Sequence, residues 1–124
     1  MDPTELYRRY LRRCNEYRFD ELGAFVAADV RVNDAPSDPA AYGAGLRSVV
    51  EAYPGFRWHL QHLVVEGDWL AARLVDTFET GDGSSHRLQE LAIYRLEEGR
   101  IAAVWGDLDP ERLPPPGGVS GTGG

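Results

Sequence analysis

The sequence lacks most of the features that would direct a protein to a membrane, to the cell exterior or to nucleic acid. Its 124 residues include a single cysteine, Cys14, which excludes an internal disulfide and fits a reducing cytoplasm. No stretch approaches the roughly 18 to 20 apolar residues that span a bilayer, and residues 1–5 lack the apolar core of a signal peptide. The formal net charge of -7 disfavours binding to phosphate backbones and anionic lipids. We therefore expect a cytoplasmic protein that binds neither nucleic acid nor membrane.

Motifs for metal binding are also missing. His59 and His62 are three residues apart, which on a strand places them on opposite faces, and His86 falls near a turn. No cluster of cysteine, histidine and aspartate has the spacing of metal ligands. We expect neither a metal nor any other cofactor.

The first half of the sequence has the residue spacing of helices. Residues 2–17 begin with an aspartate suited to an N-cap and a proline, and continue with apolar residues at helical spacing. We expect a shorter helix at about residues 20–26, a short strand at about 30–33 and a third helix at about 46–53.

From Phe56 onward the apolar residues alternate, which is typical of strands. We expect four strands at about residues 56–66, 69–80, 85–97 and 100–108, antiparallel because the turns between them are short. Helices followed by a meander predict an α+β fold in which the helices cover one face of a curved sheet. Residues 110–124 are rich in proline and glycine, so we expect one domain over residues 1–109 and a disordered tail.

The last two expected strands are partly apolar on both faces. One face packs on the helices, and the other needs cover, most simply from a second copy of the sheet. We therefore expect a homodimer, with Leu91, Ile93 and Val104 at its interface.

Three acidic residues interrupt the apolar faces of these strands. Every second residue is apolar in segments 70–78, 88–96 and 101–107, except for Asp76, Glu90 and Asp107. Alternate residues share one face, so each carboxyl group is expected among apolar neighbours, unless a strand is turned the other way. Burial of a carboxylate is costly unless it is paired or protonated, and clusters of such groups perform acid–base chemistry.

Several large side chains are candidates for the wall of this pocket. Trp105 shares the expected face of Asp107, Leu88 shares that of Glu90, and Leu74 shares that of Asp76. Trp58 is a further candidate, although large aromatic residues are also common in an ordinary core.

The first strand offers two polar candidates. Asn33 either aims its amide at the carboxyl groups or forms a turn beside Asp34. Arg31 shares the face of Asn33 and is either a countercharge within the pocket or an exposed residue.

The order of these elements resembles the SnoaL-like branch of the nuclear transport factor 2-like superfamily, whose members are cone-shaped α+β barrels. The resemblance covers about residues 4–109. It depends on the order and spacing of four segments: residues 25–30, 65–68, 96–101 and 105–107.

Within that superfamily the sequence is similar to limonene-1,2-epoxide hydrolase, because residues 32–36 and 41–43 resemble its pocket strand and the following loop. This resemblance implies an Asp-Arg-Asp catalytic group, with Asp107 and Asp76 as its two aspartates. It also implies that Asn33 helps to hold the attacking water.

The sequence departs from that family at three positions. Arg31 stands where the family has a water-holding tyrosine, and Leu74 stands where it has the bridging arginine. Arg73 lies one residue away and needs a bulge to point inward. Glu90 occupies a position that is apolar in that family.

These observations favour an enzyme without a cofactor that acts on a small apolar or polyketide-like molecule by general acid–base catalysis. The chemistry includes ring closure, isomerisation and epoxide opening. The roles are Asp107 as base, Asp76 or Glu90 as acid, Asn33 as orienting group, and Arg31 or Arg73 as the group that stabilises negative charge. The alternative is a non-catalytic module of the same fold that binds a small molecule or a protein.

Overall fold

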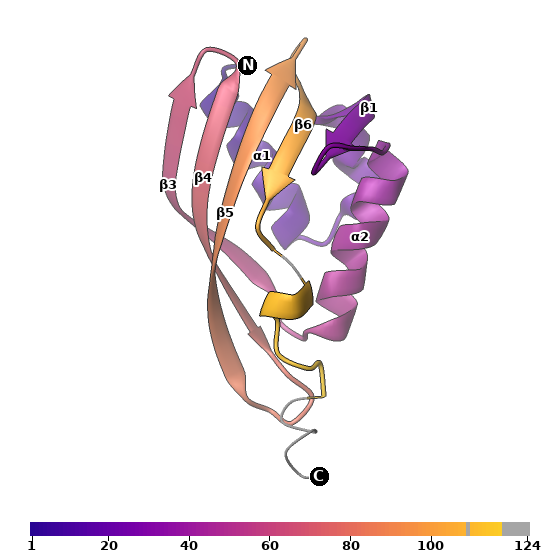
Figure 1. The fold of residues 1–124 in the computed structure, drawn as a ribbon, viewed down its shortest axis with the longest axis vertical. Helices are drawn as coiled ribbons and strands as arrows, with labels where there is room; N and C mark the ends of the chain where they lie inside the picture. Colours follow the sequence, from indigo (N-terminus) through magenta and orange to yellow (C-terminus); the bar gives the residue numbers. More distant parts are fainter. Residues whose placement is uncertain (109, 118–124) are drawn as a thin grey trace.

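The computed structural model describes residues 1–108 and 110–117 of the chain. Two helices and a six-stranded sheet form most of the structure, with short 3-10 helices labelled η (Figure 1). The elements are α1 (Pro3–Asn15), η1 (Phe19–Ala24), β1 (Val26–Val32), β2 (Ala35–Pro36), α2 (Pro39–Ala52), β3 (Arg57–Glu66), β4 (Trp69–Glu79), β5 (Ser85–Glu97), β6 (Arg100–Gly106) and η2 (Pro110–Arg112).

The sheet is curved and has the strand order β2-β1-β6-β5-β4-β3. Strand β1 runs parallel to β6, whereas every other pair of neighbours is antiparallel. Figure 1 shows α1 behind the long strands and α2 beside them, so the helices cover one side of the sheet. The predicted cone-shaped α+β fold is confirmed. The interior is called the concave side below, and the opposite face the convex side.

Helix α1 fixes the position of β3 through its last residue. The helix begins where the Asp2 side chain accepts a hydrogen bond from the Glu5 amide at 2.8 Å, with proline next in the chain. At its end, the Asn15 side chain donates to the Trp58 carbonyl at 2.9 Å and accepts from the Trp58 amide at 2.8 Å. This double contact holds Trp58 at the start of β3, where its ring is buried inside the cone.

Helix α2 lies close to η1 because one of its residues has no side chain. A Cβ atom added at Gly43 would lie 2.7 Å from the carbonyl oxygen of Phe19, which is too close for real atoms. Gly43 is the only fully buried residue of α2. Its neighbours Tyr42 and Leu46 extend from this contact towards the interior of the cone.

The chain beyond β6 packs against the domain instead of leaving it. The Tyr53 hydroxyl donates to the Pro114 carbonyl at 2.6 Å, and the Gly81 amide donates to the Pro116 carbonyl at 2.7 Å. We call residues 110–117 the C-terminal strap; Figure 1 shows its helix η2, in yellow, between α2 and the long hairpin. The prediction of disorder is therefore wrong for residues 110–117, and residues 118–124 lie outside the described part of the chain.

We predict that Gly43→Ala lowers the free energy of unfolding by about 1–3 kcal/mol, because the new methyl group overpacks the α2–η1 contact. Thermal and urea unfolding would measure the loss. Gly45→Ala is the matched control on the same helix, since no atom lies within 4 Å of its added Cβ. That control should gain about 0.5–1 kcal/mol from the better helix propensity of alanine. Equal effects of the two substitutions would contradict the contact.

Candidate active site

The strand register places two acidic residues on the concave face of neighbouring strands. Leu74 pairs with Glu90 across β4 and β5, and Asp76 pairs with Leu88, so the two carboxyl groups are diagonal neighbours. Such diagonal pairs lie within reach of each other's side chains. Asp76 is 0% exposed and Glu90 is half-buried, so both were predicted on the correct face.

A single shared proton explains the hydrogen bonding of this pair. Among the described residues, neither oxygen of Asp76, nor Oε1 of Glu90, has a hydrogen-bond partner when both groups are ionised. Two ionised carboxylates have no donor between them, whereas a protonated carboxyl group has one O–H. A proton on Asp76 therefore allows it to donate to Glu90 and removes one of the two buried charges.

The pKa shifts of the two groups also place the proton on Asp76. Burial is the main effect that raises the pKa of Asp76 far above its usual range, followed by its hydrogen bond to Glu90 and the charge of Glu90. Burial also raises the pKa of Glu90, but hydrogen bonds from Asp76 and from Trp58 oppose this effect. At neutral pH the pair thus holds a protonated Asp76 beside Glu90, and it titrates as one unit.

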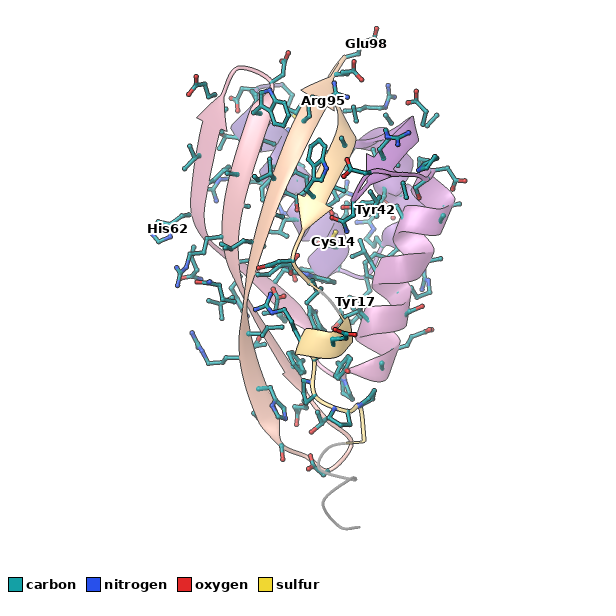
Figure 2. All side chains as sticks on the ribbon, in the orientation of Figure 1. Cys14, Tyr17, Tyr42, His62, Arg95 and Glu98 are labelled. Carbon is teal, nitrogen blue, oxygen red and sulfur yellow. The ribbon has the colours of Figure 1, made fainter. Side chains whose placement is uncertain are left out.

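The pair lies next to an enclosed cavity of about 60 Å³ inside the cone. Its wall combines Glu90 with tyrosines of both helices and of β5, and with apolar residues of the core: Tyr7, Tyr10, Leu11, Cys14, Tyr42, Leu46, Trp58, Leu74, Ala92, Tyr94, Val104 and Gly106. Figure 2 shows Cys14 and Tyr42 together between the sheet and α2. The cavity is therefore mostly apolar, with one carboxyl group and several hydroxyl groups.

Three predicted wall residues lie on the concave side. Trp58 pairs with Asp76 and is 5% exposed, Leu74 is 1% exposed and lines the cavity, and Leu88 is half-buried beside Asp76. They surround the carboxyl pair with apolar surface, which is the origin of its perturbed pKa values.

Cys14 has no role as a nucleophile in this cavity. Burial raises its pKa to about 12, with a smaller opposing effect from Tyr10. The group is consequently a neutral thiol at physiological pH, and thiols are much weaker nucleophiles than thiolates.

The predicted inward orientation of Trp105 and Asp107 is wrong. The pairing of β5 with β6 shifts at Ala102, so Ile101 pairs with Leu96 whereas Ala103 pairs with Arg95. The extra residue reverses the alternation, and Trp105 lies on the convex side, stacked on Trp69 with ring centroids 5.9 Å apart. A β-bulge of this kind leaves little trace in the amino-acid pattern.

Asp107 closes the end of the β5–β6 ladder. Its Oδ1 accepts a hydrogen bond from the Leu91 amide at 2.7 Å, and its Oδ2 lies 3.1 Å from Nη1 of Arg112 on the strap. Both contacts occupy the carboxylate outside the cavity. Its charge still raises the pKa values of Asp76 and Glu90, whereas Arg112 lowers them.

The polar residues expected to assist the pair also lie elsewhere. Asn33 is in a turn with φ 49°, and its Oδ1 accepts from the Gly106 amide at 3.0 Å, so the turn-forming interpretation is correct. Arg31 is exposed and donates to the Asp34 carbonyl. Arg73 is on the convex face, where its Nε donates to Oε1 of Gln89 at 2.8 Å. A bulge of β3 lies opposite Arg73 but does not turn it inward.

Among residues 1–108 and 110–117, no group of three or more histidine, cysteine or acidic side chains could hold a metal ion. Neither helix in the same part of the chain is long and apolar enough to cross a membrane.

Four tyrosines of the cavity were not predicted as site residues: Tyr7, Tyr10, Tyr42 and Tyr94. One of them carries a signal in the sequence, because Tyr94 lies four residues after Glu90 and therefore on the same face of β5. The others come from helices, whose position over the sheet is a tertiary property.

Comparison with known proteins supports the architecture. The sequence profile of the SnoaL-like domain matches residues 7–104. A SnoaL-like polyketide cyclase from Agrobacterium tumefaciens superposes with a TM-score of 0.79 at 29% identity, over 87% of this chain and 91% of the other. No curated protein matches the sequence.

Two more distant structures share the fold. IdmH from Streptomyces antibioticus, a proposed polyketide cyclase, has a TM-score of 0.78 at 18% identity, over 86% of this chain and 91% of its own. TerC, crystallised with polyporic acid, has a TM-score of 0.75 at 12% identity, over 88% of this chain and 92% of its own.

We predict that Asp76→Asn makes the protein more stable at neutral and alkaline pH. The raised pKa means that the folded state binds more protons than the unfolded state above the ordinary pKa of aspartic acid, so wild-type stability falls as pH rises through that window. The variant should gain more than about 1.4 kcal/mol at pH 8, the equivalent of one pKa unit. Its stability should also depend less on pH.

Urea unfolding at pH 5, 7 and 9 would measure this difference. Asp29→Asn, at an exposed position on β1, is the control and should follow the wild-type profile. A parallel pH dependence of the Asp76 variant and wild type would show that Asp76 is ionised in the folded state.

Proposed function

This chain belongs to the SnoaL-like domain family, and we propose that it is a cofactor-independent enzyme that acts on a small, largely apolar molecule by general acid–base catalysis. The observation that carries the proposal is the buried pair of Asp76 and Glu90, which holds a proton beside an enclosed cavity. Two carboxyl groups whose environments separate their pKa values are the usual arrangement of an acid and a base in one site.

The proposed base is Glu90 instead of Asp107. Glu90 lines the cavity, whereas the Asp107 carboxylate is occupied by the Leu91 amide and by Arg112. Glu90 accepts a proton from the substrate, and Asp76 gives its own proton to an oxygen on which negative charge develops. Transfer of the proton from Glu90 to Asp76 then restores the starting state.

This chemistry fits ring closure or isomerisation of a polyketide-like molecule better than epoxide hydrolysis. Neither reaction needs a bound water, and the residues expected to hold water or bridge two aspartates, Asn33, Arg31 and Arg73, lie outside the cavity. The structural relatives named as polyketide cyclases support the same class of substrate.

The substrate needs a movement of the covering elements to reach the pair. The cavity of about 60 Å³ has room for only a few water molecules. Helix α2 is the least buried cover, since only Gly43 of its residues is fully buried. We therefore propose that the structure is a closed state and that α2 moves to admit the substrate.

We predict that Glu90→Gln slows proton abstraction by roughly 100-fold or more, since a positioned base typically contributes 10² to 10⁴ in rate. Hydrogen–deuterium exchange at the carbon beside the carbonyl of acetophenone, followed by NMR in D₂O, would measure it. Asp29→Asn is the control and should exchange at the wild-type rate, because Asp29 is exposed and does not line the cavity. Full activity of Glu90→Gln with loss of activity in Asp107→Asn would return the role of base to Asp107. Retention of the ketone without exchange by wild type would favour a binding module.

We also propose that the chain forms a homodimer through the convex face of the sheet. A row of side chains crosses four strands there: Val64, Ala71, Ile93 and Trp105 pair in register. Together with Trp69 and Leu91 they form the convex patch. Val64, Trp69, Leu91 and Ile93 are between 46% and 64% exposed. The row carries no charge, so two copies can meet without repulsion between like charges.

Val104, expected at this interface, is instead 7% exposed on the concave side because of the bulge at Ala102.

We predict that Ile93→Glu converts a dimer of wild type into a monomer at micromolar concentration, because it places a charge in the centre of the patch. Light scattering after size-exclusion chromatography would measure the mass. Val65→Glu is the matched control: Val65 is 38% exposed and pairs with the buried Leu70, on the side of the sheet away from the patch. A monomeric wild-type protein, or a dimer that survives Ile93→Glu, would contradict this interface.

A further inference from the structure

Strand β5 extends beyond the end of β6, and the C-terminal strap lies along the edge that is left free. The pairing of β6 with β5 runs from Glu97 to Ala92, and the Asp107 amide then donates to the Leu91 carbonyl at 3.1 Å. Residues 85–90 of β5 lie beyond this point. Figure 1 shows helix η2 of the strap, in yellow, between this part of the hairpin and α2. The strap thus takes the place that a longer β6 would occupy.

The strap binds both β5 and α2. On the β5 side, Nη2 of Arg112 donates to the Gln89 carbonyl at 2.8 Å, and Nη1 donates to the Asp107 carbonyl at 2.8 Å. On the α2 side, the Pro114 carbonyl accepts a hydrogen bond at 2.6 Å from Tyr53, the C-cap residue of α2. The strap therefore ties the end of α2 to the free edge of β5.

A third contact fixes the far end of the strap to the turn between β4 and β5. The Gly81 amide donates to the Pro116 carbonyl at 2.7 Å. A Cβ atom added at Gly81 would lie 3.4 Å from that oxygen and from Cα of Gly117, so the strap approaches the turn closely. The strap consequently joins three elements at one end of the cone: α2, β5 and the β4–β5 turn.

The acid pair lies at the same level of the sheet as the contact of Arg112 with β5. Gln89 stands between Glu90 and Leu88, and Leu88 pairs with Asp76, which is 0% exposed. Burial is the main effect that raises the pKa of Asp76 and of Glu90, and the charge of Arg112 acts in the opposite direction on both. The strap is therefore connected to the pair by its charge as well as by its position.

The strap is held by few contacts and is stiff because of its composition. Residues 111–112 and 115–117 are exposed, whereas Leu113 and Pro114 are half-buried. The three consecutive prolines at 114–116 lack amide hydrogens and favour an extended polyproline conformation. A segment that is stiff before it binds loses little conformational entropy on closing, so a few hydrogen bonds are enough to hold it. Loss of one of these bonds should measurably change the balance between bound and released strap.

We infer that the strap is a gate: its release from α2 or from β5 opens the cone, and its return closes the cavity over a bound molecule. The inference rests on the proposed function, in which α2 moves to admit the substrate. The end of α2 can separate from β5 only when the strap releases one of them, because the strap binds Tyr53 on one side and Gln89 on the other. Closure of the gate also returns the charge of Arg112 to the surroundings of the acid pair.

Cys14 reports the opening of the cone without any turnover. It is the single cysteine of the chain, it lines the cavity, and it is 2% exposed (Figure 2). Burial raises its pKa to about 12, so the thiol reacts slowly in the closed state. Alkylation by iodoacetamide, followed by mass spectrometry, therefore measures how often the cavity opens.

We predict that Tyr53→Phe and Arg112→Gln each raise the alkylation rate of Cys14 by roughly 2- to 10-fold, the effect of one lost hydrogen bond on the opening equilibrium. Tyr53→Phe removes the bond to the strap but retains the packing of the ring on Phe78, with centroids 5.1 Å apart. Arg112→Gln removes the guanidinium group that binds β5.

Arg9→Gln is the matched control. Arg9 pairs with Glu5 at 2.7 Å on α1, the helix that carries Cys14, so a general loss of helix stability would appear in this variant as well. It should be alkylated at the wild-type rate. The urea dependence separates local opening from unfolding, because release of the strap exposes little surface whereas unfolding exposes the whole core. The rate should therefore rise only slightly at low urea concentration.

Three results would overturn the gate. They are an unchanged alkylation rate in both Tyr53→Phe and Arg112→Gln, an equal rise in Arg9→Gln, and a wild-type rate that follows the urea dependence of global unfolding.

Hydrogen–deuterium exchange of acetophenone separates the gate from the proposed function. Faster alkylation in both strap variants, without exchange by wild type, supports the gate and contradicts the proposed enzyme. Exchange that is lost in Glu90→Gln, with alkylation unaffected in both strap variants, supports the enzyme and overturns the gate.

Discussion

The burial of one proton between two carboxyl groups is the constraint on which the rest of this structure depends. Asp76 and Glu90 face the interior from neighbouring strands, and ionisation of both would leave two like charges among apolar side chains. One proton removes one charge and supplies the donor that the pair lacks. The arrangement still lowers stability relative to an apolar pair in the same place. Natural proteins accept such a cost mainly at functional sites, where activity and stability oppose each other.

Glu90 carries the remaining charge of the pair, and groups on three different elements influence its pKa. Trp58 opposes the effect of burial on Glu90, and its own position depends on the Asn15 side chain at the end of α1. Arg112 on the strap has a similar effect, but the Asp107 that it contacts acts in the opposite direction. A helix end, a strand start and the strap thus jointly set how readily Glu90 ionises. A local change in any of them reaches the site through electrostatics, without a change in the fold.

Much of the fold and two of the three carboxyl groups of the cluster were predictable from alternation along single strands. The period of two from Phe56 onward predicted the meander, and it placed Asp76 and Glu90 correctly because β4 and β5 pair without a shift over their whole length. The same reasoning failed for Asp107, since one extra residue at Ala102 reverses the face of everything after it. The proline- and glycine-rich composition predicted disorder from residue 110 onward. In the structure, however, the carbonyl groups of Pro114 and Pro116 accept hydrogen bonds from Tyr53 and Gly81.

The site residues that could not be predicted from the sequence are those that contact their partners only in the folded chain. Tyr7 and Tyr94 are 87 residues apart, and Tyr10 and Tyr42 are 32 apart, yet each pair shares a hydrogen bond. On a helix stripe such as that of α1, a tyrosine that packs in a core and a tyrosine that lines a cavity have the same spacing. The difference becomes visible only once the helices are placed over the sheet. A carboxyl group is unusual on an apolar strand face, because its burial is costly, whereas a tyrosine is common there. For that reason the acid–base pair could be predicted from the sequence and the neighbouring tyrosines could not.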